Sequence, residues 1–505
     1  MPASSIAGDS HASIGSSWFD SYPIRVLAAV ATFTIAGVCQ ARQLSALDDS
    51  NIWWHLRTGA WILQNHAIPR SGLFSQSAST AWVDASWGFD VFAGTVYRAL
   101  SLTAIPVMLL IMQLMIAVAL FGLTYKASRS FWIAIALACA GQYAIYPVQP
   151  SPSLFSIAFL AIQLHLLLSY QHNGNAKTLF WLPVLFMVWV NVDRQFYYGF
   201  LVLTLFCGCL VAQELCRRSG LSWVDTDSRS VNLVVVGAVA AASLICTFLS
   251  PYGYHLHGAI WQGATDSAAD RYFRELHSMR FRQPQDYVLM LLAMAAFFAL
   301  GRRRSRDLFL ISLLAVSSVI SFRLQRDNWL VVVVALAVTA NACQKRTQIA
   351  DSVPLQRSRF KAILISGALA LVVLGVTAIR IPGNAQLVSR ISTTFPVAAA
   401  DYIRQYHFPP PLFQPYAWGG FLTWYLPDYP VFIDSRPDLY GAAFNTEYFK
   451  VMQAQIPFDT YSGFAQARTI LLESNSPMVL ALASLPGFRI AYADHLAVVI
   501  LRNPE

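Results

Sequence analysis

Charged side chains are scarce in this chain. Only 12% of its 505 residues are Asp, Glu, Lys or Arg, and 56% are hydrophobic. Soluble domains carry about 25% charged residues, so this composition excludes an ordinary soluble globular protein. The apolar runs are near the length of about 17 to 25 residues that crosses a bilayer as a helix. The composition therefore predicts an α-helical polytopic membrane protein.

Motifs for metal, nucleotide or disulfide chemistry are also missing. All seven cysteines lie in or beside apolar segments, and there is no CxxC or Cys/His metal spacing. The chain contains no P-loop, GxGxxG fingerprint, GxSxG elbow or zincin helix, which argues against ATP-driven transport and serine hydrolysis. The net charge of +9 arises mainly from short loops between apolar runs. That distribution reports membrane topology and predicts no nucleic-acid partner.

The apolar runs divide the chain into an N-terminal segment and about eleven predicted spans. Residues 1–22 lack the basic segment of a secretory signal peptide, so we expect a disordered cytoplasmic segment before an uncleaved first span. The runs on either side of 191–195 are also compatible with one long kinked helix. Residues 89–100 are too short to span and predict an amphipathic helix on the membrane surface. The predicted spans are 24–40, 104–125, 131–146, 154–170, 179–191, 196–216, 231–249, 287–300, 308–321, 329–343 and 362–379.

Basic residues fall in alternate loops, which predicts the orientation. By the positive-inside rule these loops face the cytoplasm. The first external loop (41–101) and everything after residue 380 then lie outside. The basic residues in question are Lys126, Arg129, Lys177, Arg217, Arg218, Arg229, Arg302, Arg303, Arg304, Arg306, Lys345, Arg346, Arg357, Arg359 and Lys361.

The C-terminal 381–505 segment differs from the rest. Short apolar runs at 430–433, 469–472 and 497–501 alternate with turn residues and helical patches. This pattern predicts a small extracytoplasmic α/β domain of about 120 residues. It would follow a transmembrane domain that covers residues 23–380.

An acidic pair, Asp48 and Asp49, follows the first predicted span, with Trp53, Trp54 and His55 close behind. Carboxylates next to a membrane are costly unless they have a role. Two interpretations stay open, a helix cap or solvated turn and a catalytic or metal-binding role. The aromatic residues could stack on a sugar ring or a polyprenyl chain, or form an interfacial belt.

Further acids lie at the predicted outer ends of other segments. Asp84 precedes the amphipathic stretch, together with Trp87 and Asp90, and we favour a helix cap for it. Asp193 and Arg194 lie between two adjacent spans. They are either a structural pair or a second acidic site that faces the first external loop.

Two arginines lie in a short external loop, against the positive-inside trend. Arg323 and Arg326 suit bidentate phosphate binding. Pairing of Arg326 with Asp327, or contact with lipid headgroups, is the alternative. A weaker version of the pattern occurs at Arg271, Arg274 and Glu275.

In the outer domain, the predicted strand at 430–433 runs into Asp434, Arg436 and Asp438. Ligands often bind at the carboxyl ends of strands in α/β sheets. A structural network that joins these three charges to the membrane domain is the other interpretation.

This layout resembles the GT-C superfamily of integral-membrane glycosyltransferases, which use polyprenyl-phosphate-linked sugars. That group includes protein O-mannosyltransferases, the aminoarabinose transferase of lipid A and lipopolysaccharide-core transferases. The resemblance rests on the acidic pair after the first span, the long first external loop, about eleven spans and an external C-terminal domain. A group of uncharacterised bacterial membrane proteins of this type shares motifs at 49–56, 68–70, 74–75, 418–441 and 488–502.

The resemblance implies a bacterial inner-membrane enzyme that transfers a sugar from a polyprenyl-phosphate donor to a glycolipid, polysaccharide or protein outside the cytoplasm. One of Asp48 and Asp49 would be the general base, while the other positions the acceptor or binds a divalent cation. Arg323 and Arg326 would hold the lipid phosphate. Trp53, Trp54, His55, Asp84, Asp193 and Arg194 would contribute to the substrate site.

Two alternatives come from other classes of protein. A transporter would need charges within the bundle, for which His165 and Glu214 are the candidates. A non-catalytic scaffold for cell-envelope polysaccharide assembly would keep the fold without the chemistry.

Overall fold

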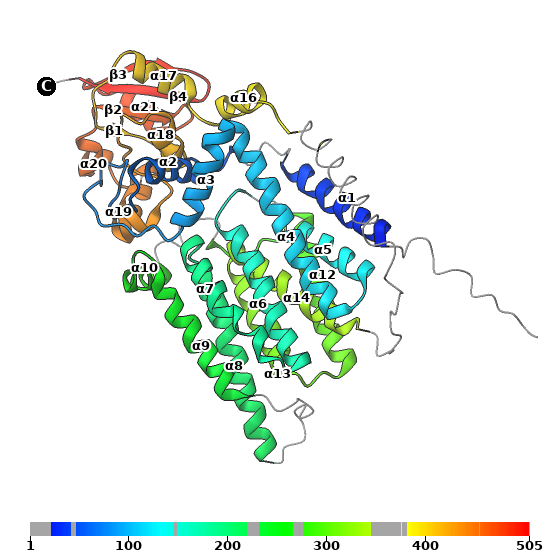
Figure 1. The fold of residues 1–505 in the computed structure, drawn as a ribbon. Coiled ribbons are helices and arrows are strands. Elements are labelled where there is room, and N and C mark those ends of the chain that lie inside the picture. The colour runs from blue at the N-terminus through cyan, green and yellow to red at the C-terminus, as the bar shows by residue number, and fades with distance from the viewer. Residues whose placement is uncertain are drawn as a thin grey trace, which may run out of the picture.

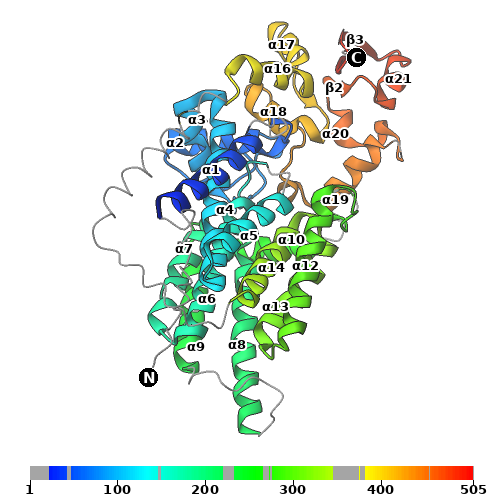
Figure 2. The ribbon, with the colours of Figure 1, turned by 90° about the vertical axis from the view of Figure 1, so that its right-hand side faces the viewer.

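The computed structural model describes residues 22–41, 47–145, 149–219, 232–265, 272, 276–344, 375, 381–453 and 455–503. A bundle of helices carries a smaller domain with a sheet at one end (Figures 1 and 2). The first external loop packs between the two. This junction brings together segments that are more than 300 residues apart in the sequence.

Helices occupy ten of the eleven predicted spans, and the eleventh, 362–379, lies almost wholly outside the described residues. Four helical stretches are long and apolar enough to cross a membrane by themselves: Trp87–Ser128, Ser153–Asn173, Phe196–Arg218 and Pro284–Arg303. The polytopic helical architecture is confirmed, whereas the number of spans is not. The bundle helices are α1 (Tyr22–Ala41), α4 (Ala104–Ser128), α5 (Phe131–Ile145), α6 (Ser153–Asn173), α7 (Trp181–Val192), α8 (Phe196–Arg218), α9 (Leu233–Cys246), α12 (Pro284–Arg303), α13 (Leu308–Arg323) and α14 (Trp329–Ala342).

The chain reverses direction between α7 and α8. The rings of Phe186 on α7 and Phe200 on α8 stack with centroids 4.5 Å apart. A Cβ atom on Gly199 would lie 2.7 Å from the Trp189 ring, so α8 can approach α7 closely only with glycine there. These segments therefore form a helical hairpin, and the alternative of one long kinked helix is wrong.

The first external loop contains two helices, α2 (Ser50–Asn65) and α3 (Trp87–Leu100). The predicted helix at 89–100 is thus confirmed as α3, and its place on the membrane surface stays a prediction. The two helices cross in close contact, since a Cβ atom on Gly59 would lie 1.9 Å from the carbonyl oxygen of Asp90. The indole N–H of Trp87 donates to the side-chain oxygen of Asn191 at 3.0 Å, which joins α3 to the end of α7.

The outer domain has a four-stranded sheet of order β1-β2-β4-β3, in which β1 and β2 are parallel and the other neighbours antiparallel. The predicted runs at 469–472 and 497–501 form β2 and β4. Its elements are α16 (Asn384–Thr394), α17 (Val397–Gln405), β1 (Leu412–Phe413), α18 (Tyr416–Tyr425), α19 (Pro437–Met452), α20 (Ser462–Ala465), β2 (Thr469–Glu473), α21 (Pro477–Ala483), β3 (Phe488–Ala493) and β4 (Ala497–Arg502).

The predicted strand at 430–433 is wrong. Val431 forms only an isolated parallel bridge with Ser75 of the first external loop. Its N–H donates to the carbonyl of Phe74 at 3.1 Å, and its carbonyl accepts from the N–H of Gln76 at 2.9 Å. The backbone of this apolar run is therefore paired with the loop and not with the sheet.

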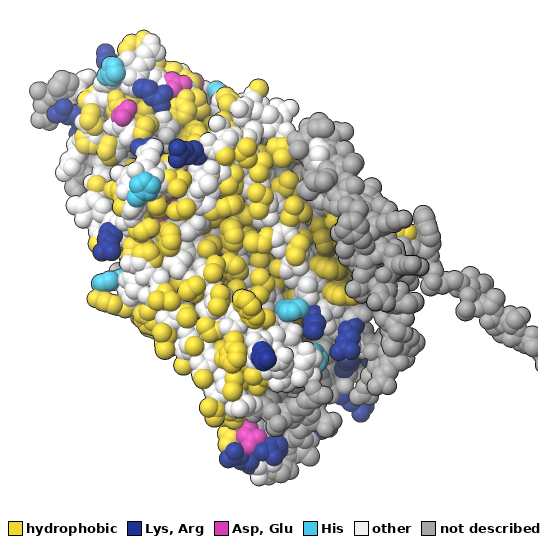
Figure 3. Space-filling view, in the orientation of Figure 1, with side chains coloured by type: hydrophobic (Ala, Val, Ile, Leu, Met, Phe, Trp, Pro, Cys, Tyr) yellow, Lys and Arg dark blue, Asp and Glu magenta, His cyan; other side chains and the backbone are white. Residues whose placement is uncertain are grey.

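Basic residues gather at the end of the bundle away from the outer domain, where Figure 3 shows dark-blue side chains. His172 at the end of α6 lies close to Lys126, Arg129 and Asp307, and Arg303 donates to the carbonyl of Gln344 at 2.7 Å. These predicted cytoplasmic loops thus lie at one end. Which face of the membrane they occupy stays a prediction.

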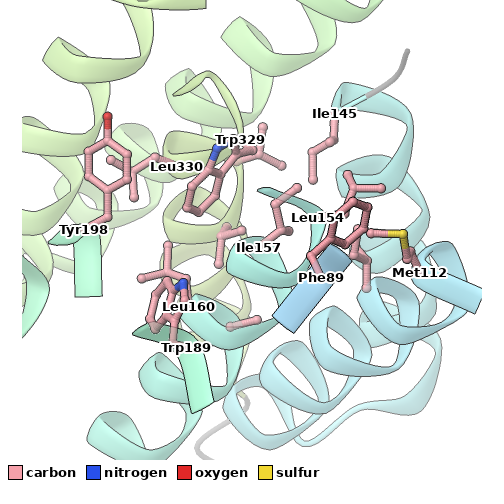
Figure 4. Close-up of a cluster of buried hydrophobic side chains, with 14 of the residues drawn as sticks. Phe89, Met112, Ile145, Leu154, Ile157, Leu160, Trp189, Tyr198, Trp329 and Leu330 are labelled. Carbon is pink, nitrogen blue, oxygen red and sulfur yellow. The ribbon is translucent and has the colours of Figure 1, made fainter. Parts of the chain in front are cut away.

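Large apolar side chains both fill the bundle and cover its sides. At its centre, Phe89, Leu154, Trp189 and Trp329 come together from α3, α6, α7 and α14 (Figure 4). The outer faces of α9, α12 and α13 expose apolar side chains, and Figure 3 shows an extended yellow surface on the side of the bundle that contains α6, α7 and α9. A folded protein leaves so much apolar surface exposed where lipid covers it.

Candidate functional site at the junction of bundle and outer domain

Asp48 is paired with the outer domain. Arg390 on α16 donates from Nε to Oδ1 of Asp48 at 3.0 Å, and its Nη2 forms an ion pair with Oδ2. The hydroxyl of Thr394 donates to the same Oδ1 at 2.9 Å. Both carboxylate oxygens therefore accept hydrogen bonds from α16, a bidentate geometry that holds the group in place.

Asp49 has a different environment and caps α2. Its Oδ1 accepts from the backbone N–H of Asn51 at 2.9 Å and from the side-chain amide of Asn51 at 2.9 Å. This is the arrangement expected of an Asp that precedes the first helical residue. The side chain is 9% exposed.

The two acids do not converge on a common point. The contacts of Asp48 lead to α16, while Asp49 turns into the start of α2. Within the described ranges, no group of three or more His, Cys, Asp or Glu side chains has an arrangement that could hold a metal ion. Asp48 and Asp49 together therefore do not fit the divalent cation that the resemblance implies.

His55, one turn further along α2, is hydrogen-bonded to an acid on α3. Its Nδ1 lies 2.5 Å from Oδ1 of Asp90, and both side chains are buried. The ring stacks on Trp54 with centroids 3.7 Å apart and meets Phe89 edge to face at 4.9 Å. Burial lowers the pKa of His55 to about 4, although Asp84, Asp49 and Asp193 act in the opposite direction. The imidazole is therefore neutral at pH 7.

Asp84 lies against Asp90 and does not cap α3. Its Oδ1 accepts from the backbone N–H of Ser86 at 3.0 Å, and its buried Oδ2 has no hydrogen-bond partner among the described residues. Burial, and then the nearby charge of Asp90, raise the pKa of Asp84 well above its ordinary value. Burial also raises the pKa of Asp90 well above its ordinary value, so the two neighbouring buried carboxyls both resist ionisation.

Asp193, between α7 and α8, is another buried acid near His55. Its Oδ2 accepts from the hydroxyl of Ser156 at 2.5 Å, and that hydroxyl accepts from the indole N–H of Trp189 at 2.7 Å. Burial raises the pKa of Asp193 to about 6, while the Ser156 hydrogen bond and then Arg194 and Arg326 act to lower it. Asp193 is close enough to His55 to raise its pKa. We call Asp49, His55, Asp84, Asp90 and Asp193 the acidic cluster.

Asp434 and Arg436 of the outer domain form a buried ion pair. The guanidinium donates from Nη2 to Oδ2 of Asp434 at 2.6 Å and from Nε to Oδ1 at 3.0 Å. Its Nη2 also donates to the carbonyl of Leu73 at 2.9 Å, and its Cζ lies 4.8 Å from the ring centroid of Trp82. Arg436 thus connects the outer domain to the first external loop beside the acidic cluster.

A second connection involves Arg194, whose Nη1 lies 2.5 Å from Oδ2 of Asp438 on α19. This ion pair is half exposed and joins the turn between α7 and α8 to the outer domain. Trp53 joins the same parts through apolar contact, because its buried ring packs against Phe395, Phe421 and Trp424. The contacts of Trp53 are those of a core residue.

The two arginines of the 322–328 loop differ in their surroundings. Nε of Arg326 lies 3.5 Å from Oδ1 of buried Asp327, which also accepts from Gln195 Nε2 at 2.8 Å and from the Tyr198 hydroxyl at 2.5 Å. Arg326 also acts on Asp193. Arg323 is exposed at the end of α13, and no acidic side chain in the described part of the chain pairs with it. Arg271, Arg274 and Glu275 lie outside the described residues.

The sequence pattern alone missed several members of this site. From the sequence, Asp90 was named only as a neighbour of Asp84, for which a helix cap was favoured. An acid directly between Phe89 and Val91 is itself a signal of a functional site. Ser156 had no such signal, because a serine in an apolar helix is common. Arg390 and Thr394 lie 342 and 346 residues from Asp48, and nothing in the local sequence indicates that contact.

Among the comparisons with known proteins, the one with solved structures gives a match. No protein-family model matches the chain, and no curated protein matches it. The fold is similar to the crystal structure of ArnT from Cupriavidus metallidurans bound to undecaprenyl phosphate, with 14% sequence identity and a TM-score of 0.49. The match covers 95% of this chain and 99% of that one. At this identity and TM-score, no residue role is transferred from that protein to this chain.

Proposed function

We propose that the protein is a membrane glycosyltransferase that moves a sugar from a polyprenyl-phosphate-linked donor to an acceptor at the junction of bundle and outer domain. The acidic cluster is the observation that carries this proposal. It buries the hydrogen-bonded pair of His55 and Asp90 beside Asp84, with Asp49, Asp193 and two arginines close by. Buried titratable groups with displaced pKa values, gathered between domains, are typical of active sites. The sequence resemblance supplies the class of donor.

Asp49 is the general base in this proposal. Asp48 is unsuited to the role because both its oxygens already accept hydrogen bonds from Arg390. In the transfer step, the acceptor hydroxyl gives its proton to the carboxylate of Asp49 as its oxygen bonds to the anomeric carbon. The bond from that carbon to the phosphate oxygen breaks, and the polyprenyl phosphate leaves with the electron pair.

Arg326 is the residue we assign to the leaving phosphate. Its guanidinium lies 3.5 Å from Asp327 and is close enough to Asp193 to lower the pKa of that carboxyl. Arginine can donate two parallel hydrogen bonds to a phosphate and stabilise the charge that develops on it. Arg323, three residues earlier and exposed, adds positive charge to the approach of an anionic lipid.

Trp54 and His55 are buried aromatic residues in the helix that the proposed base caps. Their rings stack 3.7 Å apart, and Asp49 begins the same helix. Arg436 lies over the indole of Trp54, with its Cζ 5.8 Å from the ring centroid. The ring is therefore fixed from the outer-domain side.

The direct test is sugar transfer by purified protein in proteoliposomes, with a membrane extract as the source of lipid-linked donor and acceptor and mass spectrometry as the readout. Wild type should transfer sugar, Asp49→Asn should lose transfer while remaining folded, and Asp48→Asn should retain it. Loss in Asp48→Asn with full activity in Asp49→Asn would reverse the assignment of the base. A wild-type protein that transfers nothing would reject the transferase.

A non-catalytic scaffold is the second candidate, and one observation favours it. Asp48, Asp434 and Asp438 are each paired with an arginine, and two of these pairs cross between the outer domain and the rest of the chain. A scaffold needs such connections and no free base. It predicts that Asp49→Asn and wild type behave alike in every assay, including assembly of the cell envelope.

The two residues that could indicate transport do not favour it over these two functions. Glu214 is paired with Arg217 and Arg218 at the end of α8, at 2.8 Å in each case. Nδ1 of His165 lies 3.3 Å from the carbonyl of Gly122. Neither residue is an isolated charge inside the bundle, which is what a transport pathway would need.

A further inference from the structure

Helix α10 (Tyr254–Thr265) leaves the bundle at a steep angle. The axes of Leu233–Leu249 and Tyr254–Thr265 differ by 95°, with a break of four residues between them. Gly253 in the break has a φ of 52°, a left-handed conformation that glycine adopts without strain. Both ribbon views place α10 beside α19, at the end of the bundle that carries the outer domain (Figures 1 and 2).

One face of α10 packs against the protein, and another is exposed. Leu256 is fully buried, and the ring of His257 meets Phe196 edge to face at 5.7 Å. In contrast, the side chain of Trp261 is 74% exposed and that of Tyr254 is 70% exposed. Two large aromatic rings on the outside of one short helix indicate a surface that something apolar covers.

The exposed face of α10 continues the lipid-facing surface of the bundle. On α9 and the turn that leads from it into α10, Val234, Ile245 and Phe248 are exposed, with exposed fractions of 80%, 66% and 47%. Helix α10 itself contains no Asp, Glu, Lys or Arg. Tryptophan and tyrosine collect at the level of the lipid headgroups, where an amphipathic ring finds both an apolar and a polar environment.

We propose that α10 is an interfacial helix, with Trp261 and Tyr254 in the headgroup layer of the leaflet on the outer-domain side. The partner of this surface is phospholipid. A helix that turns by 95° at the end of an apolar span lies in the plane of that layer when the span crosses the membrane. Its buried face then holds it against α8, and its bare face meets lipid.

This placement also sets the depth of the candidate site. A Cβ atom on Gly263 would lie 3.2 Å from Oδ1 of Asp438, so the end of α10 lies against the Arg194–Asp438 ion pair. The ion pair is therefore at headgroup level. A lipid-linked phosphate would reach Arg194 without leaving that layer, a consequence that rests on the proposed function, whereas the placement of α10 does not.

Fluorescence quenching in lipid nanodiscs tests the placement. The difference between the emission of wild type and of Trp261→Phe isolates the signal of this one tryptophan. Phospholipids brominated close to the headgroup should quench that signal more than phospholipids brominated near the end of the acyl chain. Iodide in the aqueous phase should quench it weakly. Trp418→Phe is the matched control, because the Trp418 ring is buried in the outer domain and its signal should not respond to brominated lipid.

Two results would overturn the proposal. Strong quenching by iodide without quenching by brominated lipid would place Trp261 in water, where it would serve a protein partner. Strongest quenching by the deep bromines would make α10 a re-entrant segment inside the bilayer. Neither readout depends on sugar transfer, so failure here leaves the proposed function untouched, and the reverse also holds.

Discussion

Nδ1 of His55 lies 2.5 Å from Oδ1 of Asp90, and this bond joins the two helices of the first external loop. Both side chains are buried, so the bond is shielded from water. Burial raises the pKa of Asp90 and of neighbouring Asp84 well above their ordinary values and lowers the pKa of His55. The bond between the two helices therefore joins groups whose pKa values are displaced by folding, which makes the stability of this region depend on pH.

We expect acid to destabilise the protein through His55. Its pKa is about 4 in the folded protein and about 6.5 when exposed, so the unfolded chain binds the extra proton first as the pH falls. Stability from this group is complete above pH 6.5 and is lost between pH 6.5 and pH 4. At about 1.4 kcal/mol per pH unit the loss amounts to about 3 kcal/mol.

The measurement is the unfolding temperature of wild type and His55→Gln across that pH range. Asp193, with its pKa raised to about 6, changes stability in the opposite direction, and it is common to both proteins. The titratable and charged groups that face the ring are Asp90, Asp84, Asp49, Asp193 and Arg436. Wild type should lose more stability than His55→Gln on acidification. Parallel curves would contradict a buried neutral His55.

The sequence predicted those elements whose signal is local. The amphipathic pattern of 89–100 became α3, and the apolar runs at 469–472 and 497–501 became β2 and β4. The run at 430–433 has the same composition but pairs with Ser75, more than 350 residues away, and no local pattern encodes that choice. The burial of an apolar run could be predicted, but its partner could not.

The candidate site could also be predicted from the sequence only in part. Asp49, His55, Asp84 and Asp193 could be selected from the sequence because charged or polar groups stand beside apolar spans. What separates Asp48 from its neighbour Asp49 is the position of Arg390, which depends on how the outer domain docks. Two adjacent carboxylates are equivalent by composition and acquire different roles only in the folded protein.

The Asp48–Arg390 pair should contribute to stability and little to chemistry. Both side chains are partly exposed, at 29% and 39%, so solvent screens the interaction. We expect a coupling energy of about 1 kcal/mol in a double-mutant cycle of Asp48→Asn and Arg390→Gln, measured by thermal unfolding. Sugar transfer should persist in all three variants. If Asp48→Asn abolished transfer while Arg390→Gln preserved it, Asp48 would be the base.

The Asp434–Arg436 and Arg194–Asp438 ion pairs should differ strongly in their contribution to stability. Arg436→Gln leaves Asp434 buried without its partner, which we expect to cost about 3 to 5 kcal/mol in the free energy of unfolding. Arg194→Gln removes a half-exposed partner of Asp438 and should cost about 1 kcal/mol or less. Chemical unfolding of the two purified variants makes the comparison. Equal losses would show that the burial of the Asp434–Arg436 pair has no energetic consequence.

The crossing of α2 and α3 provides the sharpest steric test. At Gly59 a methyl group would lie 1.9 Å from the backbone oxygen of Asp90, and backbone cannot move aside as a side chain can. Gly59→Ala should therefore push the helices apart, lengthen the His55–Asp90 bond and lower stability by about 1 to 3 kcal/mol. Gly208→Ala on α8 is the matched control, since its methyl group meets nothing within 4 Å and improves helix propensity. If Gly59→Ala loses the pH dependence of stability assigned to His55 and Gly208→Ala keeps it, the close crossing of α2 and α3 is what lowers the pKa of His55. Equal behaviour of the two alanine variants would show that α2 and α3 do not pack this closely.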